Sequence, residues 1–181
     1  YSHDDRTNKK IDDLPKHMIN ALVATEDARF YKHSGVDVRG LFRAVMFLGK
    51  RGGGSTITQQ LAKNMFHPER RNLVQRLLQK IKEWIISTGL EKRYTKDEII
   101  LMYFNTVPWE NSYGIKSAAK KFFNKETKDL KIEEAAVLVA MLKASAIYHP
   151  VNHPERAINR RNTVLNQMSK YKFITNEERD S

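Results

Sequence analysis

The sequence predicts a mainly α-helical fold in a single domain. Apolar residues recur three, four and seven positions apart along several segments, which is the spacing of one face of a helix. Two segments are preceded by the residue pairs of a capping box, Thr56 with Gln59 and Thr95 with Glu98. No segment shows a convincing alternation of apolar and polar residues, which would predict a strand. A chain of 181 residues is long enough to bury one core.

The first helix is expected over residues 15–31, where apolar side chains recur at helical spacing. A short and strongly apolar stretch follows at residues 41–48, with basic residues around it. Glycines 52–54 then interrupt the chain. Ser55 or Thr56 caps the next helix, because a hydroxyl accepts a hydrogen bond from the free N–H groups of the first turn.

A long helix is expected over residues 72–90, with its apolar stripe buried in the core. That stripe consists of Val74, Leu77, Ile81, Trp84 and Ile85. The following helix is expected to begin after Thr95 and to end near Asn105, ahead of Pro108.

Two further helices are expected in the last third of the chain. Residues 132–148 are rich in alanine and apolar side chains, and Pro150 stops this helix. Pro154 opens the last helix, since proline suits the first helical position. The polar tail at residues 176–181 is expected to fray. The whole pattern gives six or more helices.

The composition limits the partners of the protein. A net charge of +11 predicts an anionic partner, which is a nucleic acid, an anionic membrane surface or a phosphate-bearing substrate. The absence of cysteine excludes structural disulfides and thiolate metal sites. No apolar run approaches the length of a membrane span, and no signal peptide is visible. We therefore expect a segment excised from a longer, membrane-anchored protein.

Glu26 is in register with the apolar stripe of the first helix, seven residues after Ile19 and four after Leu22. Burying a carboxylate disfavours its charged form and raises its pKa, which suits a general base working near neutral pH. The alternative is a glutamate at the edge of the core, paired with Arg29 or Lys32. The spacing alone leaves both interpretations open.

Residues 52–64 combine three glycines, three hydroxyl side chains and a polar helix face. A glycine loop that enters a helix N-terminus offers unpaired N–H groups to an anion. Gln60, Lys63 and Asn64 share one face of the helix, so a phosphate could be bound by hydroxyl, amide and ammonium together. The alternative is a flexible surface turn with a good cap.

A second polar face lies on the long helix, opposite its apolar stripe. It consists of Arg76, Gln79, Lys80 and Glu83, which stand at i, i+3, i+4 and i+7. Two cations beside a carboxylate suit a diphosphate, or a divalent metal that bridges the carboxylate and a phosphate. The alternative is an exposed ladder of ion pairs, which contributes little to stability.

Together these segments resemble the motifs of the glycosyltransferase family 51 domain, which occurs in class A penicillin-binding proteins and in monofunctional peptidoglycan transglycosylases. The first and second family motifs are complete at residues 26–37, EDARFYKHSGVD, and 53–60, GGSTITQQ. The fourth and fifth resemble residues 96–105, KDEIILMYFN, and 134–150. The third departs from the pattern at QKIKE, because Gln79 stands where the family has arginine.

The resemblance implies a lysozyme-like fold of two lobes with a cleft, the smaller lobe lying near the membrane and including the apolar stretch 41–48. It implies a peptidoglycan glycosyltransferase that polymerises lipid II into β-1,4-linked glycan strands by inverting transfer, with release of undecaprenyl diphosphate. The implied location is the outer, periplasmic face of the bacterial cytoplasmic membrane. The implied partners are lipid II, the growing lipid-linked glycan, the anionic membrane surface, a C-terminal transpeptidase domain and the cell-wall synthesis machinery, without nucleic acid.

The resemblance also implies roles for individual residues. Glu26 is expected to be the base that deprotonates the acceptor. Glu83 is expected to be a second catalytic carboxylate, which either binds a divalent ion or orients Lys80. No cofactor is required, and Mg²⁺ or Mn²⁺ near Glu83 stays open. The substrate-binding residues implied are Asp27, Phe30, Ser55, Gln60, Lys63, Asn64, Arg71, Arg76 and Lys80.

Two other functions are compatible with parts of the sequence. A lysozyme-like hydrolase also uses a pair of acids, but cleavage of a neutral glycan needs no phosphate site such as the glycine loop with Lys63. A helical nucleic-acid-binding domain is suggested by the charge alone. Its basic residues are spread over all the helices and are not gathered on one recognition helix.

Overall fold

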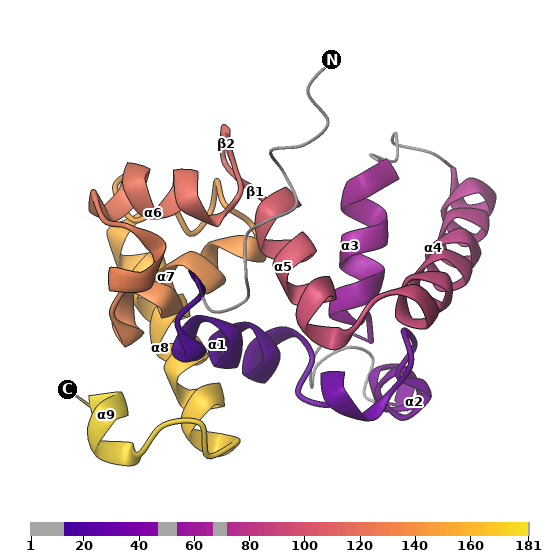
Figure 1. Ribbon diagram of the computed structural model, residues 1–181, viewed down its shortest axis with the longest axis horizontal. Helices are drawn as coiled ribbons and strands as arrows, with labels where there is room; N and C mark the ends of the chain where they lie inside the picture. The colour runs from indigo at the N-terminus through magenta and orange to yellow at the C-terminus, as the bar shows by residue number, and fades with distance from the viewer. Residues whose placement is uncertain (1–12, 47–53, 67–71, 181) are drawn as a thin grey trace. The chain divides into compact units, whose positions relative to one another are not determined.

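The computed structural model describes residues 13–46, 54–66 and 72–180, and these form a mainly α-helical structure (Figure 1). The prediction of a mainly α fold is therefore confirmed. The chain divides into two compact units. One consists of residues 23–107, and the other joins the residues before 23 to those from 108 onward. Helix α1, Lys16–Glu26, runs through the boundary.

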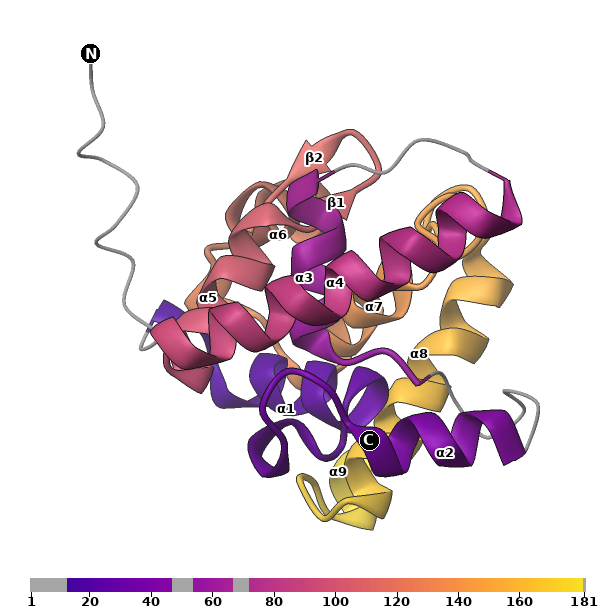
Figure 2. The same cartoon turned by 90° about the vertical axis from the view of Figure 1, so that its right-hand side faces the viewer.

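The unit of residues 23–107 is organised around helix α3. Its elements after α1 are η2 (Phe30–Lys32), α2 (Val38–Met46), α3 (Ile57–Phe66), α4 (Leu73–Arg93) and α5 (Lys96–Thr106). Helix α3 packs against both α4 and α5, as Figures 1 and 2 show. Its side chains Ile57 and Leu61 have no exposed surface. The helix that follows the glycine loop is thus the core of this unit.

Three helices of this unit begin at capping boxes. At α3, the backbone N–H of Gln59 donates to Thr56 Oγ1 at 3.1 Å, and the N–H of Thr56 donates to Gln59 Oε1 at 3.3 Å. Thr95 and Glu98 form the same arrangement at α5, and Asn72 heads a further box at α4. Both boxes predicted from the sequence are confirmed. Each box satisfies N–H groups of a first helical turn, which fixes where the helix begins.

The other unit packs a long helix pair against a small hairpin. Its elements after the start of α1 are β1 (Pro108–Trp109), β2 (Ser112–Tyr113), α6 (Ile115–Phe123), η3 (Thr127–Asp129), α7 (Ile132–Leu142), α8 (Pro154–Lys170) and α9 (Asn176–Asp180). Helix α7 packs along α8, and Leu138 and Val164 have no exposed surface. The indole Nε1 of Trp109 donates to the carbonyl of Leu138 at 2.8 Å, which ties the hairpin to α7.

Two helix ends, a strand pair and the tail differ from the sequence expectation. Helix α1 ends at Glu26, and the chain turns before η2 instead of continuing as helix to residue 31. Helix α7 ends at Leu142, six residues before the expected end at residue 148. The expectation of no strand is wrong, because Pro108 and Trp109 pair antiparallel with Tyr113 and Ser112. A pair of two-residue strands is too short for a period to be visible in the sequence. The tail forms helix α9 from residue 176, where fraying was expected.

Helix α4 turns inward the face opposite to the one expected. Leu77 and Ile85 are 65% and 66% exposed, whereas Glu83 is 7% exposed and Ser87 is completely buried. The prediction of a buried apolar stripe is therefore wrong. Its exposed members are Val74, Leu77, Ile81 and Ile85, and Trp84 is half-buried. An amphipathic pattern shows that a helix has two unlike faces, and tertiary packing decides which of them faces the core.

Gly35 lies where the loop before α2 touches α4, and we predict that it tolerates no side chain. Its φ is +92°, and a Cβ there would lie 2.8 Å from the backbone carbonyl of Ser87. Strain at positive φ and overpacking together lead us to expect that Gly35→Ala lowers the free energy of unfolding by about 3 kcal/mol in urea titration. The matched control is Gly89→Ala on α4, where a Cβ meets nothing within 4 Å. It is expected to raise stability by about 0.5–1 kcal/mol, and equal losses for both variants would contradict this packing.

Candidate active site

The carboxylate of Glu26 stands at the last residue of α1 and is bound by a glutamine of α3. Its Oε2 accepts a hydrogen bond from Gln60 Nε2 at 3.0 Å, and the side chain is half-buried. The C-terminal end of a helix carries negative dipole charge, which disfavours a carboxylate there. The amide of Gln60 offsets this by donating to it. Glu26 is thus held in one position and keeps partial access to solvent, as a group that must accept a proton requires.

The other end of the Gln60 amide is bound by a buried tyrosine of α5. Tyr103 Oη donates to Gln60 Oε1 at 3.1 Å, and Tyr103 is 1% exposed. Burial, followed by the charge of Glu26, raises the pKa of Tyr103 above its usual value. The phenol therefore stays protonated at any physiological pH. Sequence reasoning assigned no role to Tyr103, although it belongs to the fourth motif.

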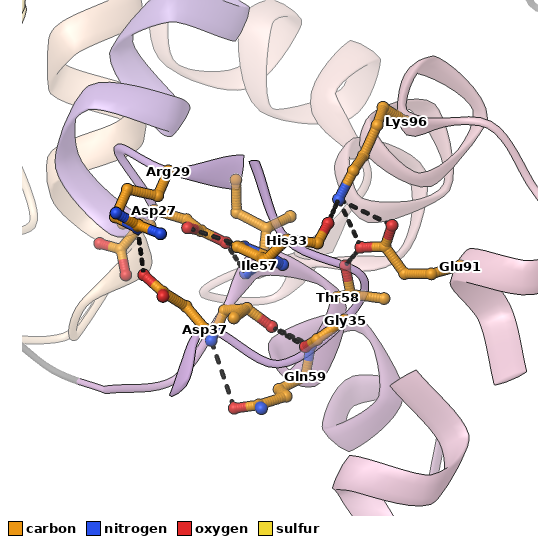
Figure 3. Close-up of polar contacts among 12 residues, drawn as sticks. Asp27, Arg29, His33, Gly35, Asp37, Ile57, Thr58, Gln59, Glu91 and Lys96 are labelled. Carbon is orange, nitrogen blue, oxygen red and sulfur yellow. Dashed lines mark hydrogen bonds and ion pairs between the residues drawn. The ribbon is translucent and has the colours of Figure 1, made fainter. Parts of the chain in front are cut away.

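Asp27 joins the first motif to the start of α3. Its Oδ1 and Oδ2 both accept from His33 Nε2, at 3.1 and 2.9 Å, and Oδ2 also accepts from the backbone N–H of Ile57 at 3.1 Å (Figure 3). The side chains of Asp27 and His33 are 4% and 5% exposed. Asp27 was expected to bind substrate. In this geometry its oxygens hold the turn after α1 against the first turn of α3.

This arrangement changes the expected phosphate site at the glycine loop. The N-terminus of α3 already receives an anion, because Asp27 accepts from Ile57 N–H, and Gln59 N–H is taken by Thr56 Oγ1. Such N–H groups were the expected ligands of a phosphate. Glycines 52 and 53 lie outside the described residues. The ammonium of Lys80, which donates to Ser55 Oγ in the described part of the loop, is therefore better placed than the helix N-terminus to attract a phosphate.

A half-buried ion pair between Lys96 and Glu91 joins three of the motifs. Lys96 Nζ donates to Glu91 Oε1 at 2.8 Å and to the carbonyl of His33 at 2.7 Å, while Thr58 Oγ1 donates to the same Glu91 oxygen at 2.6 Å (Figure 3). The ammonium also lies 4.3 Å from the ring centroid of Phe30. The Glu91 side chain is 5% exposed. Because Lys96 begins α5, this ion pair fixes the helix that carries Tyr103.

The polar face of α4 meets the residue that precedes the cap of α3. Lys80 Nζ donates to Ser55 Oγ at 2.8 Å and to Glu83 Oε2 at 2.9 Å, and Gln79 Nε2 donates to Glu83 Oε1 at 2.9 Å. The Lys80 side chain is 34% exposed, whereas that of Glu83 is 10% exposed. A nearly buried carboxylate therefore aims an ammonium that solvent and substrate can reach. The alternative of an exposed ion-pair ladder does not fit Glu83.

The carboxylate of Glu83 already binds Lys80, and a divalent cation there would compete with that ammonium. Both of its oxygens accept hydrogen bonds, and one of the donors is an ammonium 2.9 Å away. Among residues 13–46, 54–66 and 72–180, no group of three or more His, Cys, Asp or Glu side chains is placed to hold a metal ion. A cation at Glu83 would have to displace Lys80, and a positive charge so close repels it. The side chains in place suit the orientation of Lys80.

The remaining predicted site residues lie in different surroundings. Phe30 has no exposed surface, so it contacts the core and the ammonium of Lys96. Lys63 is exposed and Asn64 half-buried, both on α3 beyond Gln60. Arg76 is exposed on α4, one turn before Lys80. Arg71 falls outside the described residues.

Comparison with known proteins identifies the family of this chain. A family model described as Transglycosylase matches residues 1–169, which is nearly the whole chain. The chain belongs to the transglycosylase family. The family predicted from the sequence motifs is therefore confirmed, and with it an enzyme domain of this class. All the residues grouped above lie within the matched range.

The transglycosylase relatives are penicillin-binding proteins. The chain is 41% identical over 180 residues to penicillin-binding protein 1F of Bacillus subtilis, covering 97% of the chain and 25% of that protein. It is 43% identical over 173 residues to penicillin-binding protein 1A of Aquifex aeolicus, covering 93% and 23%. The chain thus spans about a quarter of the length of these relatives.

A solved structure shows the same fold. The crystal structure of penicillin-binding protein 1A from Haemophilus influenzae superposes with a TM-score of 0.54 at 21% identity, covering 97% of this chain and 17% of that one. At this identity the likeness concerns the fold. It agrees with the mainly α architecture, and the prediction of two lobes with one near the membrane stays a prediction.

Proposed function

We propose that this chain is a peptidoglycan glycosyltransferase domain that polymerises lipid II by inverting transfer. The observation that carries the proposal is that hydrogen bonds connect residues of several motifs within the unit of residues 23–107. A half-buried carboxylate, Glu26, is oriented by Gln60, and an oriented ammonium, Lys80, lies at Ser55 near the start of the same helix α3. A base and a cation are the two groups that a transfer from a diphosphate donor requires. Membership of the transglycosylase family supports the same reaction class.

Glu26 is the proposed base. Its carboxylate removes the proton from the 4-hydroxyl of the acceptor lipid II as that oxygen forms a bond to the anomeric carbon of the donor strand. The bond between that carbon and the diphosphate oxygen breaks with both electrons leaving on undecaprenyl diphosphate. Attack from the face opposite the α-linked diphosphate gives a β-1,4 bond. The proton on Glu26 is then lost to water.

Lys80 is the proposed electrostatic partner of the leaving group. Negative charge grows on the diphosphate as the bond breaks, and a cation already aimed at that place stabilises it without reorganisation. Glu83 and Ser55 hold the ammonium, at 2.9 and 2.8 Å. Lys63 and Arg76 are exposed cations on α3 and α4 that can bind other phosphate oxygens, and Asn64 can hydrogen-bond a sugar. No step of this transfer runs through a metal ion.

The exposed apolar face of α4 supports attachment to a membrane surface. We call Val74, Leu77, Leu78, Ile81 and Ile85 the α4 apolar face, and all are at least 42% exposed. Helix α2 covers most of the apolar stretch 41–48, and its Phe42 and Met46 are also exposed. Residues 47 and 48 lie outside the described residues. No helix among the described residues is long and apolar enough to cross a bilayer. An apolar helix face on a protein of charge +11 fits the surface of an anionic bilayer, at the outer face of the cytoplasmic membrane.

Binding to vesicles tests this face. We expect the double variant Leu77→Ser with Ile85→Ser to bind phosphatidylglycerol vesicles about 30-fold more weakly, equivalent to about 2 kcal/mol of lost apolar burial. Co-sedimentation measures the affinity. The control is Val151→Ser with Ile158→Ser, which removes exposed apolar side chains from the other unit. Equal binding by both double variants would show that the α4 apolar face does not touch the lipid.

Incubation with two substrates tests the reaction class. With lipid II, the transferase is expected to yield a ladder of glycan polymers on a gel. With mature peptidoglycan, it is expected to release no shortened strands, since a polymer lacks the diphosphate donor at internal bonds. Shortened strands without polymer would instead indicate the lysozyme-like hydrolase. Failure to shift DNA or RNA at physiological salt would separately remove a nucleic-acid-binding function.

A further inference from the structure

Three side chains from three different helices form one chain of hydrogen bonds that ends on the base. Tyr103 of α5 donates to Gln60 of α3 at 3.1 Å, and Gln60 donates to Glu26 of α1 at 3.0 Å. These residues come from the first, second and fourth sequence motifs. All three lie in the unit of residues 23–107. Both polar ends of Gln60 are used within the protein, so this side chain is occupied before any substrate arrives.

The direction of the chain is fixed by chemistry. An ionised carboxylate only accepts hydrogen bonds, so the NH₂ end of Gln60 must face Glu26. The carbonyl end of Gln60 then faces Tyr103, and a carbonyl only accepts, so the phenol must donate. The raised pKa of Tyr103 keeps that proton in place. If the phenol were absent, the carbonyl end of Gln60 would lose its donor, and the carboxylate alone would hold the amide in place.

The phenol itself is rigidly held. Tyr103 is 1% exposed, and its ring packs edge-on against Phe104 at 5.9 Å between centroids. Seven residues earlier on the same face of α5, Lys96 is bound to Glu91 and to the carbonyl of His33 (Figure 3). Helix α5 also packs along α3. The position of the hydroxyl is therefore determined by packing and by a half-buried ion pair, independently of substrate.

We propose that Tyr103 is a positioning residue for the base, acting through Gln60, and that Oε1 of Glu26 is the atom that takes the proton. Gln60 occupies Oε2. Within the described residues, Oε1 receives no hydrogen bond, so it is the oxygen open to an incoming hydroxyl. The inference rests on the proposed function. It assigns Gln60 the role of orienting the base, whereas the sequence motif implied that Gln60 binds substrate.

Steady-state kinetics with lipid II test the inference. Tyr103→Phe removes only the hydroxyl, and we expect kcat to fall about tenfold with KM unchanged, the size of one hydrogen bond lost at the base. The acidic limb of the kcat profile is also expected to move, because the amide that binds the carboxylate has lost the donor at its other end. A merely structural tyrosine would change thermal stability without moving the pH profile. Unchanged kcat and an unchanged profile would overturn the inference.

A double-variant cycle shows whether Tyr103 acts through Gln60. Gln60→Met keeps the length of the side chain and removes both polar ends. In that background, Tyr103→Phe is expected to change kcat by less than about twofold, because the chain of bonds is already broken. A further tenfold fall would show that the tyrosine acts by another route and would overturn the inference.

Two controls separate this inference from the proposed function. Tyr94→Phe, on a tyrosine 43% exposed at the end of α4, is expected to leave kcat and the pH profile unchanged. The unsubstituted chain must polymerise lipid II in the same assay. If it polymerises and Tyr103→Phe behaves like Tyr94→Phe, the inference fails and the proposed function stands. If it gives no polymer while folded, the proposed function fails first.

Discussion

The variant Glu26→Gln is expected to bind lipid II normally and to polymerise it about 10²–10⁴-fold more slowly than the unsubstituted chain. Glutamine has the same shape and can still accept a hydrogen bond from Gln60, so the 3.0 Å contact between the two side chains is expected to persist. It cannot accept the proton of the acceptor hydroxyl. The loss should therefore appear in kcat, with the dissociation constant for lipid II unchanged in an equilibrium binding assay.

The control for this variant is Glu133→Gln, which neutralises an exposed carboxylate on α7 in the other unit. It is expected to polymerise lipid II at the unsubstituted rate. Circular dichroism and thermal unfolding of both variants establish that the fold is retained. Near-normal turnover by Glu26→Gln would show that another group is the base.

The variant Lys80→Met is expected to reduce kcat about 10²–10³-fold, the range found when one preorganised donor to a developing charge is removed. Methionine keeps most of the length of lysine and removes the ammonium that Glu83 and Ser55 hold. Because the diphosphate gains charge in the transition state, the effect should fall on kcat more than on KM. Polymerisation kinetics with lipid II measure both.

The matched control is Lys82→Met, two residues along the same helix, where the lysine is exposed. It removes the same charge from the chain and is expected to change kcat by less than about twofold, since exposed charges are screened by solvent and salt. Similar losses for both variants would mean that overall charge, and not the oriented ammonium of Lys80, drives the reaction. Thermal unfolding of Lys80→Met checks that Glu83 without its partner leaves the fold intact.

The parts of the fold that were predictable from the sequence are local. The boxes at Thr56 and Thr95 were predicted because their partners stand three residues away, within one helical turn. Pro154 likewise marked the start of α8. The end of α1 at Glu26 was not predictable in this way, because the tertiary contacts of Asp27 with His33 and Ile57 hold the turn that follows.

The orientation of α4 shows a second limit of sequence reasoning. The helical period of its apolar stripe was predicted correctly, but that side of the helix is exposed and Glu83 on the other side is buried. Periodicity carries no information on which side meets the core when the apolar side serves a partner outside the chain. The net charge of +11 predicted an anionic membrane surface as one possible partner. Such a surface is also the kind of partner that an exposed apolar helix face would bind.

The sequence indicated which residues belong to the candidate site. It did not indicate the hydrogen bonds that connect them. Glu26, Lys80 and Glu83 were identified by motif and helical face. The bonds from Gln60 to Glu26 and from Tyr103 to Gln60 join residues 34 and 43 positions apart, which no local pattern reveals. One signal was present, because Lys96 and Tyr103 stand seven residues apart on one face of α5 and so had to point the same way.

The most direct test of inverting transfer by this chain is nuclear magnetic resonance of the glycan made from lipid II, together with a count of released undecaprenyl diphosphate. The transfer proposed for Glu26 and Lys80 predicts only β-1,4 bonds in the new polymer and one undecaprenyl diphosphate for each bond formed. A polymer with α linkages would contradict it. So would the release of undecaprenyl diphosphate together with free sugar and no polymer.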